Sequence, residues 1–113
     1  MSSIKFVDAQ PFLHELKKLA KKYRSLLADV EDLKEELKKE PFQGADLGNG
    51  LRKVRMAIKS KGKGKSGGAR VITYVEAITA QYEGTLIFLY IYDKSERSTI
   101  TDKELSMLLD FLD

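Results

Sequence analysis

The chain opens with a segment of alternating apolar and polar residues, SIKFV, which predicts a short β-strand. After Asp8 the spacing changes, and apolar residues recur every three or four positions, as on the buried face of a helix. The apolar positions of this second pattern are Phe12, Leu16, Leu19, Tyr23, Leu26, Leu27, Val30, Leu33 and Leu37. A break near Ser25 divides the pattern, and Pro41, which lacks a backbone N–H, cannot continue it. The pattern therefore predicts two helices in a hairpin, the second ending near Glu40.

Three further strands are predicted in the segments LRKVRMAIK, ARVITYVEAI and GTLIFLYIYDK, which follow a turn-rich stretch, PFQGADLGNG. Alternation in the first segment places Lys53 and Arg55 on one face. The opposite, apolar face of that segment comprises Val54, Met56 and Ile58. Alternation in the last segment places Ile87, Leu89 and Ile91 on one face and Phe88, Tyr90, Tyr92 and Lys94 on the other. A basic, glycine-rich hairpin is expected to join the first two of these strands.

A final helix is predicted after Thr101, because Thr101 and Glu104 have the spacing of a capping box. Its apolar stripe comprises Leu105, Leu108, Leu109 and Leu112. A chain of 113 residues is long enough for one modest core and too short for two. We therefore expect a single α+β domain over residues 1–113 in the order β-α-α-β-β-β-α. It combines a mostly antiparallel sheet, a helical hairpin and a C-terminal helix.

Positive charge is concentrated in the middle of the chain. No acidic residue lies between Asp46 and Glu76, so this interval carries +8 and the rest of the chain −5. The basic residues of the interval are Arg52, Lys53, Arg55, Lys59, Lys61, Lys63, Lys65 and Arg70. Such an asymmetry within one domain favours a polyanionic partner, and a solvated lysine loop is the alternative.

The loop KSKGKGKSGGARVITY contains Gly64-Lys65-Ser66, which matches the end of a phosphate-binding P-loop. The full motif needs a glycine five positions before Gly64, where this chain has Lys59. The motif must also open a helix, whereas this loop leads into a β-branched strand. Both departures argue against nucleotide triphosphate binding.

Composition narrows the chemistry further. The chain has no cysteine and a single histidine, His14, so a disulfide, a thiolate site and a two-histidine ribonuclease are excluded, and no metal site is expected. His14 lies on the first predicted helix, where a partly exposed helical residue is the expected role. No apolar run has the length of a membrane span, and the first ten residues lack the apolar core of a signal peptide. We expect a protein of the reducing cytoplasm with no membrane partner.

The segment GLRKVRMAIKSKGKGKSGGARVITY and the later LYIYDKSE resemble the RelE/HigB superfamily of bacterial toxins, with the HigB branch as the nearest match. The resemblance is specific from Gly50 to Glu96 and generic in the helical hairpin. It implies a RelE-like fold and a ribosome-dependent endoribonuclease, the toxin of a type II toxin–antitoxin pair, which cuts messenger RNA without a cofactor. It also implies a cognate antitoxin, expected to be a helix-turn-helix protein.

In these enzymes the ribose 2′-hydroxyl attacks the adjacent phosphorus, which requires a proton acceptor, charge stabilisation and a proton donor. The resemblance gives these roles to Lys53, Arg55, Arg70, Tyr92 and Lys94. Arg55 and Arg70 are expected to hold the scissile phosphate, because a guanidinium fork suits phosphate oxygens. Lys53 is a candidate proton acceptor or donor. Lys94 is a candidate donor to the leaving oxygen, and Tyr92 a candidate for stacking on a base.

A second set of residues is expected to contact RNA without taking part in the reaction. It comprises Arg52, Lys59, Lys61, Lys63, Lys65, Tyr90 and Arg97. The alternating glycines and lysines favour a mobile arm that follows phosphates. For the tyrosines the alternative is packing between strands. Two other functions remain open: a ParE-like toxin that binds DNA gyrase, and a degenerate family member that only binds RNA or an antitoxin.

Overall fold

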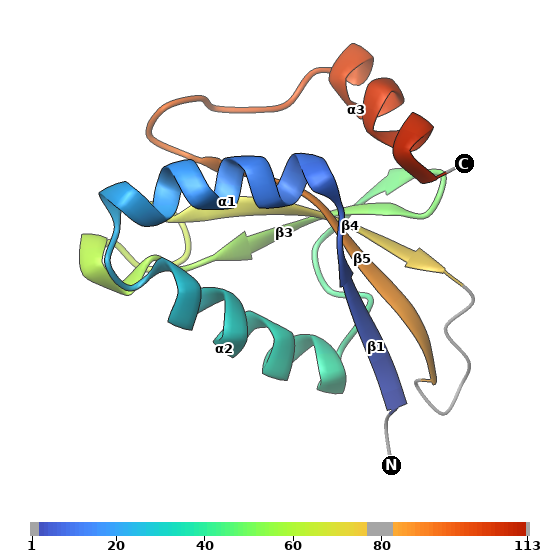
Figure 1. The fold of residues 1–113 in the computed structure, drawn as a ribbon, viewed down its shortest axis with the longest axis horizontal. Helices are drawn as coiled ribbons and strands as arrows, with labels where there is room; N and C mark the ends of the chain where they lie inside the picture. Colours follow the sequence, from blue (N-terminus) through green and yellow to red (C-terminus); the bar gives the residue numbers. More distant parts are fainter. Residues whose placement is uncertain (1–2, 77–82, 113) are drawn as a thin grey trace.

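The computed structural model describes residues 3–76 and 83–112, and it contains a five-stranded sheet with helices packed on both faces (Figure 1). In chain order the elements are β1 (Ser3–Asp8), α1 (Gln10–Lys22), α2 (Leu26–Lys39), β2 (Ala45–Gly48), β3 (Leu51–Met56), a 3-10 helix (Lys59–Lys61), β4 (Ala69–Glu76), β5 (Glu83–Asp93), α3 (Asp102–Leu109) and a 3-10 turn (Asp110–Leu112). The strand order is β1-β5-β4-β3-β2, with β1 parallel to β5 and all other neighbours antiparallel. The predicted α+β, RelE-like fold class is confirmed. In the described part of the chain, no helix has the length and apolar character needed to cross a membrane.

The structure contains a strand that the sequence pattern did not predict. β2 forms inside the stretch interpreted as a turn, and it pairs with β3 through Ala45–Lys53 and Asp46–Arg52. Four residues with glycine and aspartate are typical of a turn, so only the pairing with β3 shows a strand here. The chain approaches β3 closely at Gly44, which has φ 97° and whose added Cβ would lie 2.5 Å from the carbonyl oxygen of Lys53. The order is therefore β-α-α-β-β-β-β-α. The end of the predicted strand at 77–78 lies outside the described residues.

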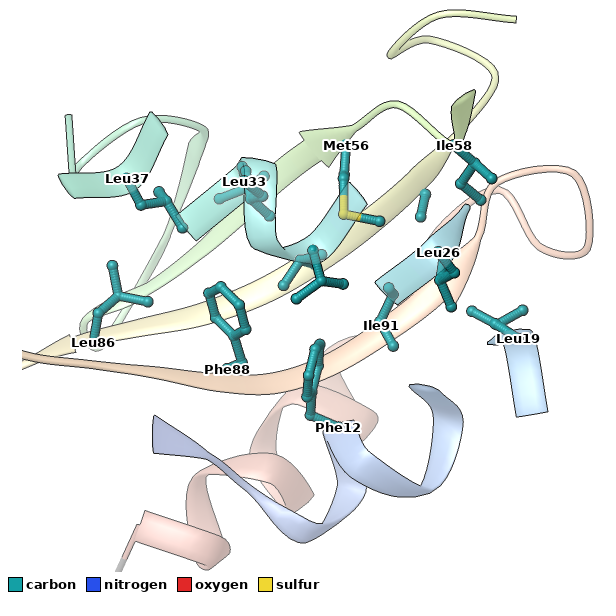
Figure 2. Close-up of a cluster of buried hydrophobic side chains, with 14 residues drawn as sticks. Phe12, Leu19, Leu26, Leu33, Leu37, Met56, Ile58, Leu86, Phe88 and Ile91 are labelled. Atoms are coloured by element: carbon teal, nitrogen blue, oxygen red, sulfur yellow. The ribbon is translucent and has the colours of Figure 1, made fainter. Parts of the chain in front are cut away.

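The helices α1 and α2 cover one face of the sheet and bury the main core against it. Figure 2 shows Leu19 of α1 and Leu26, Leu33 and Leu37 of α2 in one cluster with side chains of β3 and β5. The rings of Phe12 on α1 and Phe88 on β5 pack with centroids 5.1 Å apart. The predicted apolar face of β3 is confirmed, because Val54, Met56 and Ile58 are all buried. Burial of side chains of this size contributes about 1.5–3 kcal/mol each relative to exposure, so this layer holds β3 and β5 in place.

A second apolar cluster lies on the opposite face, under α3. It comprises Leu51, Ile72, Leu89, Tyr92, Ile100 and Leu108. Simple alternation along β5 is wrong here, because the pairing with β4 shifts register between Ile72, which faces Tyr90, and Thr73, which faces Phe88. Leu89 is thus an extra residue of β5 with no partner on β4, which forms a β-bulge. The side chains that precede the bulge therefore point to the face opposite the one that simple alternation predicts. Phe88 consequently lies with Ile91 in the main core, while Ile87 and Leu89 lie on the α3 face.

The capping box predicted for the last helix is confirmed. The Thr101 hydroxyl accepts a hydrogen bond from the Glu104 backbone N–H at 3.1 Å, and the Glu104 carboxylate accepts one from the Thr101 N–H at 3.0 Å. The same carboxylate takes two hydrogen bonds from the Arg97 guanidinium, at 2.8 and 2.5 Å. The bonds from Arg97 and Thr101 together lower the pKa of Glu104 to about 2. The cap therefore ties α3 to the segment that follows β5.

We predict that Thr101→Ala lowers the free energy of unfolding by about 1 kcal/mol, because it removes the N-cap of α3. Glu104→Gln should also destabilise the protein at neutral pH. Since the folded-state pKa of Glu104 is depressed, its contribution is present above the unfolded pKa and is lost as pH falls toward about 2. Urea unfolding between neutral and acidic pH measures both effects, with Asp110→Asn at the other end of α3 as the control. A Glu104→Gln deficit that stays constant down to the lowest pH would contradict this.

Candidate active site on the basic sheet face

Three predicted site residues form a row across the middle of the sheet. Arg55 on β3 lies directly opposite Arg70 on β4, and Arg70 lies opposite Tyr92 on β5. Lys53, two residues before Arg55, points to the same face, as alternation predicted. The row lies on the face of the sheet opposite α1 and α2. It therefore continues the surface on which α3 packs.

The predicted cations come together around one hollow of about 580 Å³ beside this row. The residues that line it are Gln43, Gly44, Ala45, Lys53, Val54, Arg55, Lys65, Arg70 and Lys94. Four cations predicted to be catalytic are thus neighbours, although they come from β3, β4 and the turn after β5. No acidic residue of the described chain is among the lining side chains. We call this hollow the basic pocket.

Arg70 is the most enclosed cation of the basic pocket, with 6% of its surface exposed. Its Nη1 donates to the carbonyl oxygens of Lys65 and Ala69, both at 3.1 Å, and its Nη2 donates to that of Ser66 at 3.3 Å. Among the described residues no carboxylate pairs with it. Burial, and then the neighbouring charge of Arg55, lower the pKa of Arg70. A buried cation beside a like charge is costly, so this site is suited to an anion.

The other pocket cations are held more loosely. Lys94 follows the last residue of β5; its backbone N–H donates to the Gly68 carbonyl at 3.0 Å and its Nζ to the Ser98 carbonyl at 2.7 Å. Lys53 and Arg55 have no side-chain hydrogen bond within the described residues. The loop can approach β3 this closely only with glycine at position 68, because an added Cβ would lie 2.1 Å from the Met56 carbonyl oxygen. The close approach of Gly68 to the end of β3 brings the loop, Arg70 and Lys94 to one place.

Tyr92, the third residue of the row, lies beside Arg70 on the neighbouring strand but does not line the basic pocket. Only 4% of its surface is exposed, and the Arg97 guanidinium lies over its ring, 5.4 Å from the centroid. Burial raises the pKa of Tyr92, against the opposing effect of the nearby Arg70, and its hydroxyl has no hydrogen-bond partner among the described residues. The ring is therefore not available for the predicted stacking on a base in this conformation, and packing between strands describes it better.

The loop between β3 and β4, residues 57–68, which we call the lysine loop, is docked on the protein, which corrects the expectation of a mobile arm. In Figure 1 it lies beside the junction of α1 and α2. Lys59 pairs with Asp32 at 2.7 Å and Lys65 with Glu36 at 2.8 Å, both on α2. Lys61 is almost fully enclosed, with its Nζ 2.8 Å from Asp93. Lys63 alone among the four lysines of this loop has no side-chain partner within residues 3–76 and 83–112. Ion pairs within the protein therefore occupy most of the charge that was expected to contact RNA.

Lys65 lines the basic pocket, whereas the remaining predicted RNA contacts, Arg52, Tyr90 and Arg97, do not. Arg52 donates to the Phe42 carbonyl at 2.7 Å and lies 3.9 Å from Asp46. Arg97 is bound to Glu104, as described above. Tyr90 lines a different groove, between α1 and α3, together with the exposed His14. Their contacts with RNA stay predictions, and the exposure of His14 agrees with the role expected for it.

The sequence patterns missed two residues next to this site, Asp93 and Tyr23. Asp93 is the buried last residue of β5, and its carboxylate accepts hydrogen bonds from Lys61, Tyr23 and Ser95. Burial alone would raise the pKa of Asp93, but these bonds outweigh it and hold the pKa well below its usual range. A carboxylate that ends an otherwise apolar strand was the available signal. Its partners are too distant in the sequence for any spacing rule to find them.

Comparison with known proteins identifies the family. The model of the RelE toxin of the RelE/RelB toxin–antitoxin system matches residues 10–111. The chain belongs to the RelE toxin family. This RelE-family protein is accordingly the toxin of a type II toxin–antitoxin system, and a cognate antitoxin is its partner. A comparison with curated proteins found no match. Within the described residues, no group of three or more His, Asp or Glu side chains is placed to hold a metal ion.

We predict that Arg55→Gln raises the free energy of unfolding by about 0.5 kcal/mol at low ionic strength, because it removes the like charge opposite Arg70. The gain should shrink as salt is added, since salt screens an exposed charge. Urea unfolding at low and high salt measures this. The control is Arg24→Gln, an exposed arginine outside the sheet, which should give no gain. A destabilised Arg55→Gln protein would show that the two arginines are not in conflict.

Proposed function

We propose that this RelE-family toxin is a ribosome-dependent endoribonuclease of the HigB branch, which cleaves messenger RNA and so inhibits translation. The observation that carries the proposal is the basic pocket, where Lys53, Arg55, Arg70 and Lys94 meet without an acidic side chain. A phosphodiester is the polyanion that such a pocket fits. Translating ribosomes are cytoplasmic, so the protein acts in the cytoplasm.

Arg70 is the principal phosphate ligand in this proposal. A guanidinium has five N–H donors, and the three bonds to backbone carbonyls leave two of them for a ligand. Because those bonds already orient the group, binding a phosphate requires little further ordering. Arg55 faces Arg70 from the next strand and adds a second fork to the same phosphate. Negative charge that develops on the phosphorane is then stabilised by two adjacent cations, of which Arg70 is already oriented by its backbone hydrogen bonds.

The two lysines carry the proton transfers. Lys53, as the neutral amine, takes the proton of the 2′-hydroxyl while the 2′ oxygen forms its bond to phosphorus. The bond from phosphorus to the 5′ oxygen breaks, and the Lys94 ammonium donates a proton to that oxygen. The products are a 2′,3′-cyclic phosphate and a free 5′-hydroxyl. Tyr92 is buried beside Arg70 and has a packing role, in place of the stacking role expected from the sequence.

The docked lysine loop favours dependence on the ribosome. Lys59, Lys61 and Lys65 pair with acidic side chains, which leaves few free cations to hold a flexible RNA strand. A ribosome holds the messenger strand in place and so supplies the orientation that the toxin lacks. We infer that the antitoxin is a small helix-turn-helix protein. An adjacent reading frame of another class would count against that inference.

We predict that Arg70→Ala abolishes growth inhibition and lowers the cleavage rate by about 100- to 1000-fold, the usual cost of losing a donor to transition-state charge. Circular dichroism should show a folded protein, because the core on the α1–α2 face is untouched. Arg24→Ala, which changes an exposed arginine outside the basic pocket, is the matched control and should stay fully toxic. Full toxicity of Arg70→Ala would remove the central residue of the proposal.

We predict discrete cuts in a translated message, mapped by primer extension, and little cutting of the same RNA without ribosomes. A 2′-deoxy substitution at the cleaved nucleotide should abolish the cut, because it removes the attacking hydroxyl. Supercoiling defects with an intact message would instead favour the ParE-like, gyrase-binding alternative. Binding of RNA or antitoxin with no cut under any condition would favour a degenerate member.

A further inference from the structure

A buried carboxylate lies just outside the basic pocket, at the end of β5. The Asp93 side chain is fully enclosed, yet it does not line the pocket. Its Oδ1 accepts hydrogen bonds from the Lys61 Nζ at 2.8 Å, the Ser95 N–H at 2.9 Å and the Ser95 hydroxyl at 2.7 Å. Its Oδ2 accepts the Tyr23 hydroxyl of the α1 C-cap and lies 3.8 Å from the Lys22 Nζ. Asp93 thus joins α1, the lysine loop and the turn after β5.

The Lys61 side chain is held from several directions. Besides Asp93, its Nζ donates to the Ser95 hydroxyl at 3.2 Å and lies over the Tyr23 ring, 5.3 Å from the centroid. Only 8% of the Lys61 side chain is exposed. A buried lysine of this kind is stable only while its carboxylate partner is present, because an unpaired buried charge is strongly destabilising. Loss of Asp93 would therefore release Lys61 and the loop that carries it.

This loop carries the acceptors that orient Arg70. The carbonyl oxygens of Lys65 and Ser66, four and five residues after Lys61, accept two of the three side-chain hydrogen bonds of Arg70. On the other side, Lys94 directly follows Asp93, and its backbone N–H donates to the Gly68 carbonyl of the same loop. Asp93 therefore influences the positions of both Arg70, the phosphate ligand of the proposed reaction, and Lys94, its proton donor.

We propose that Asp93 is a positioning residue of the active site: through Lys61 it fixes the loop carbonyls that orient Arg70, and through its own turn it places Lys94. The inference rests on the proposed ribonuclease function. It differs from a purely structural role in what it predicts, which is a loss of rate in a protein that remains folded and still binds its substrate.

The same loop offers a matched control. The pair formed by Lys59 and Asp32 joins the loop to α2 at 2.7 Å, but both side chains are more than half exposed. Exposed pairs of this kind contribute little to structure. Asp32→Asn therefore removes an ion pair of the same chemistry, from the same loop, without releasing Lys61. It should leave the cleavage rate within about twofold of the unchanged protein.

The experiment compares Asp93→Asn, Lys61→Met and their double variant on ribosomes programmed with a defined message. We expect kcat to fall by about 100-fold in each, as for a misplacement of about 1 Å, while KM stays nearly constant. The double variant should be no worse than the worse single one, because both changes break one connection. Lys61→Arg, which keeps the charge, should recover much of the rate. Thermal unfolding establishes that each rate is measured on folded protein.

A second measurement needs no ribosome. The Nε–Hε signal of Arg70, assigned by its loss in Arg70→Ala, is followed by nitrogen-15 NMR in the free toxin. Asp93→Asn and Lys61→Met should shift and broaden this signal, and Asp32→Asn should not. If Asp93→Asn does not fold, Lys61→Met and Tyr23→Phe provide the test.

The outcomes separate the two proposals. If the unchanged toxin cuts no message, while Asp93→Asn still disturbs the Arg70 signal, the ribonuclease function is wrong and the positioning of Arg70 stands. If the toxin cuts and the variants keep both its kcat and the Arg70 signal, the role of Asp93 is overturned. A fall in kcat with an unchanged Arg70 signal would likewise overturn the proposed route through Arg70.

Discussion

Two arginines face each other across neighbouring strands, and the organisation of the site follows from holding them there. Arg55 and Arg70 are direct partners in the β3–β4 pairing, and Arg70 is buried. Like charges opposite each other weaken a sheet, so the pair persists only because other contacts outweigh the repulsion. Backbone carbonyls of Lys65, Ser66 and Ala69 accept the Arg70 hydrogen bonds, and these neutral acceptors leave its charge unneutralised. A site that is costly in the free protein and relieved by an anion is what phosphate binding requires.

The main hydrophobic core and the candidate active site lie on opposite faces of the sheet. On one face, α1 and α2 bury a continuous apolar layer against β3 and β5 (Figure 2). The opposite face is divided between the α3 cluster and the basic pocket. The bulge at Leu89 makes this division possible, because it moves Phe88 into the main core while Tyr90 and Tyr92 stay on the α3 face. Polar chemistry can therefore vary on one side without removing the packing that holds the strands.

Fewer lysines of the lysine loop are free to bind a partner than its net charge suggests. Lys59 and Lys65 meet acids of α2, and Lys61 meets Asp93. The acids of the −5 remainder of the chain thus neutralise much of the +8 interval after folding. Four cations of this interval have no carboxylate partner within the described residues, and three of them, Lys53, Arg55 and Arg70, line the basic pocket. The positive field is consequently narrower than the sequence suggests, and it coincides with the site where a phosphate is proposed to bind.

Local pattern determined much of this protein: the two helices and their division near Ser25, the apolar face of β3, the capping box at Thr101, and the shared face of Lys53 and Arg55. These features depend on residues close together in the chain, where helical or strand periodicity applies. The tertiary structure alone decided the edge strand β2, the phase change in β5 and the docking of the lysine loop. Each depends on a partner far away in sequence: β2 on β3, Leu89 on the register with β4, and Lys61 on Asp93. Spacing rules describe one strand or one helix, whereas a register or a buried ion pair is set by which distant segments meet.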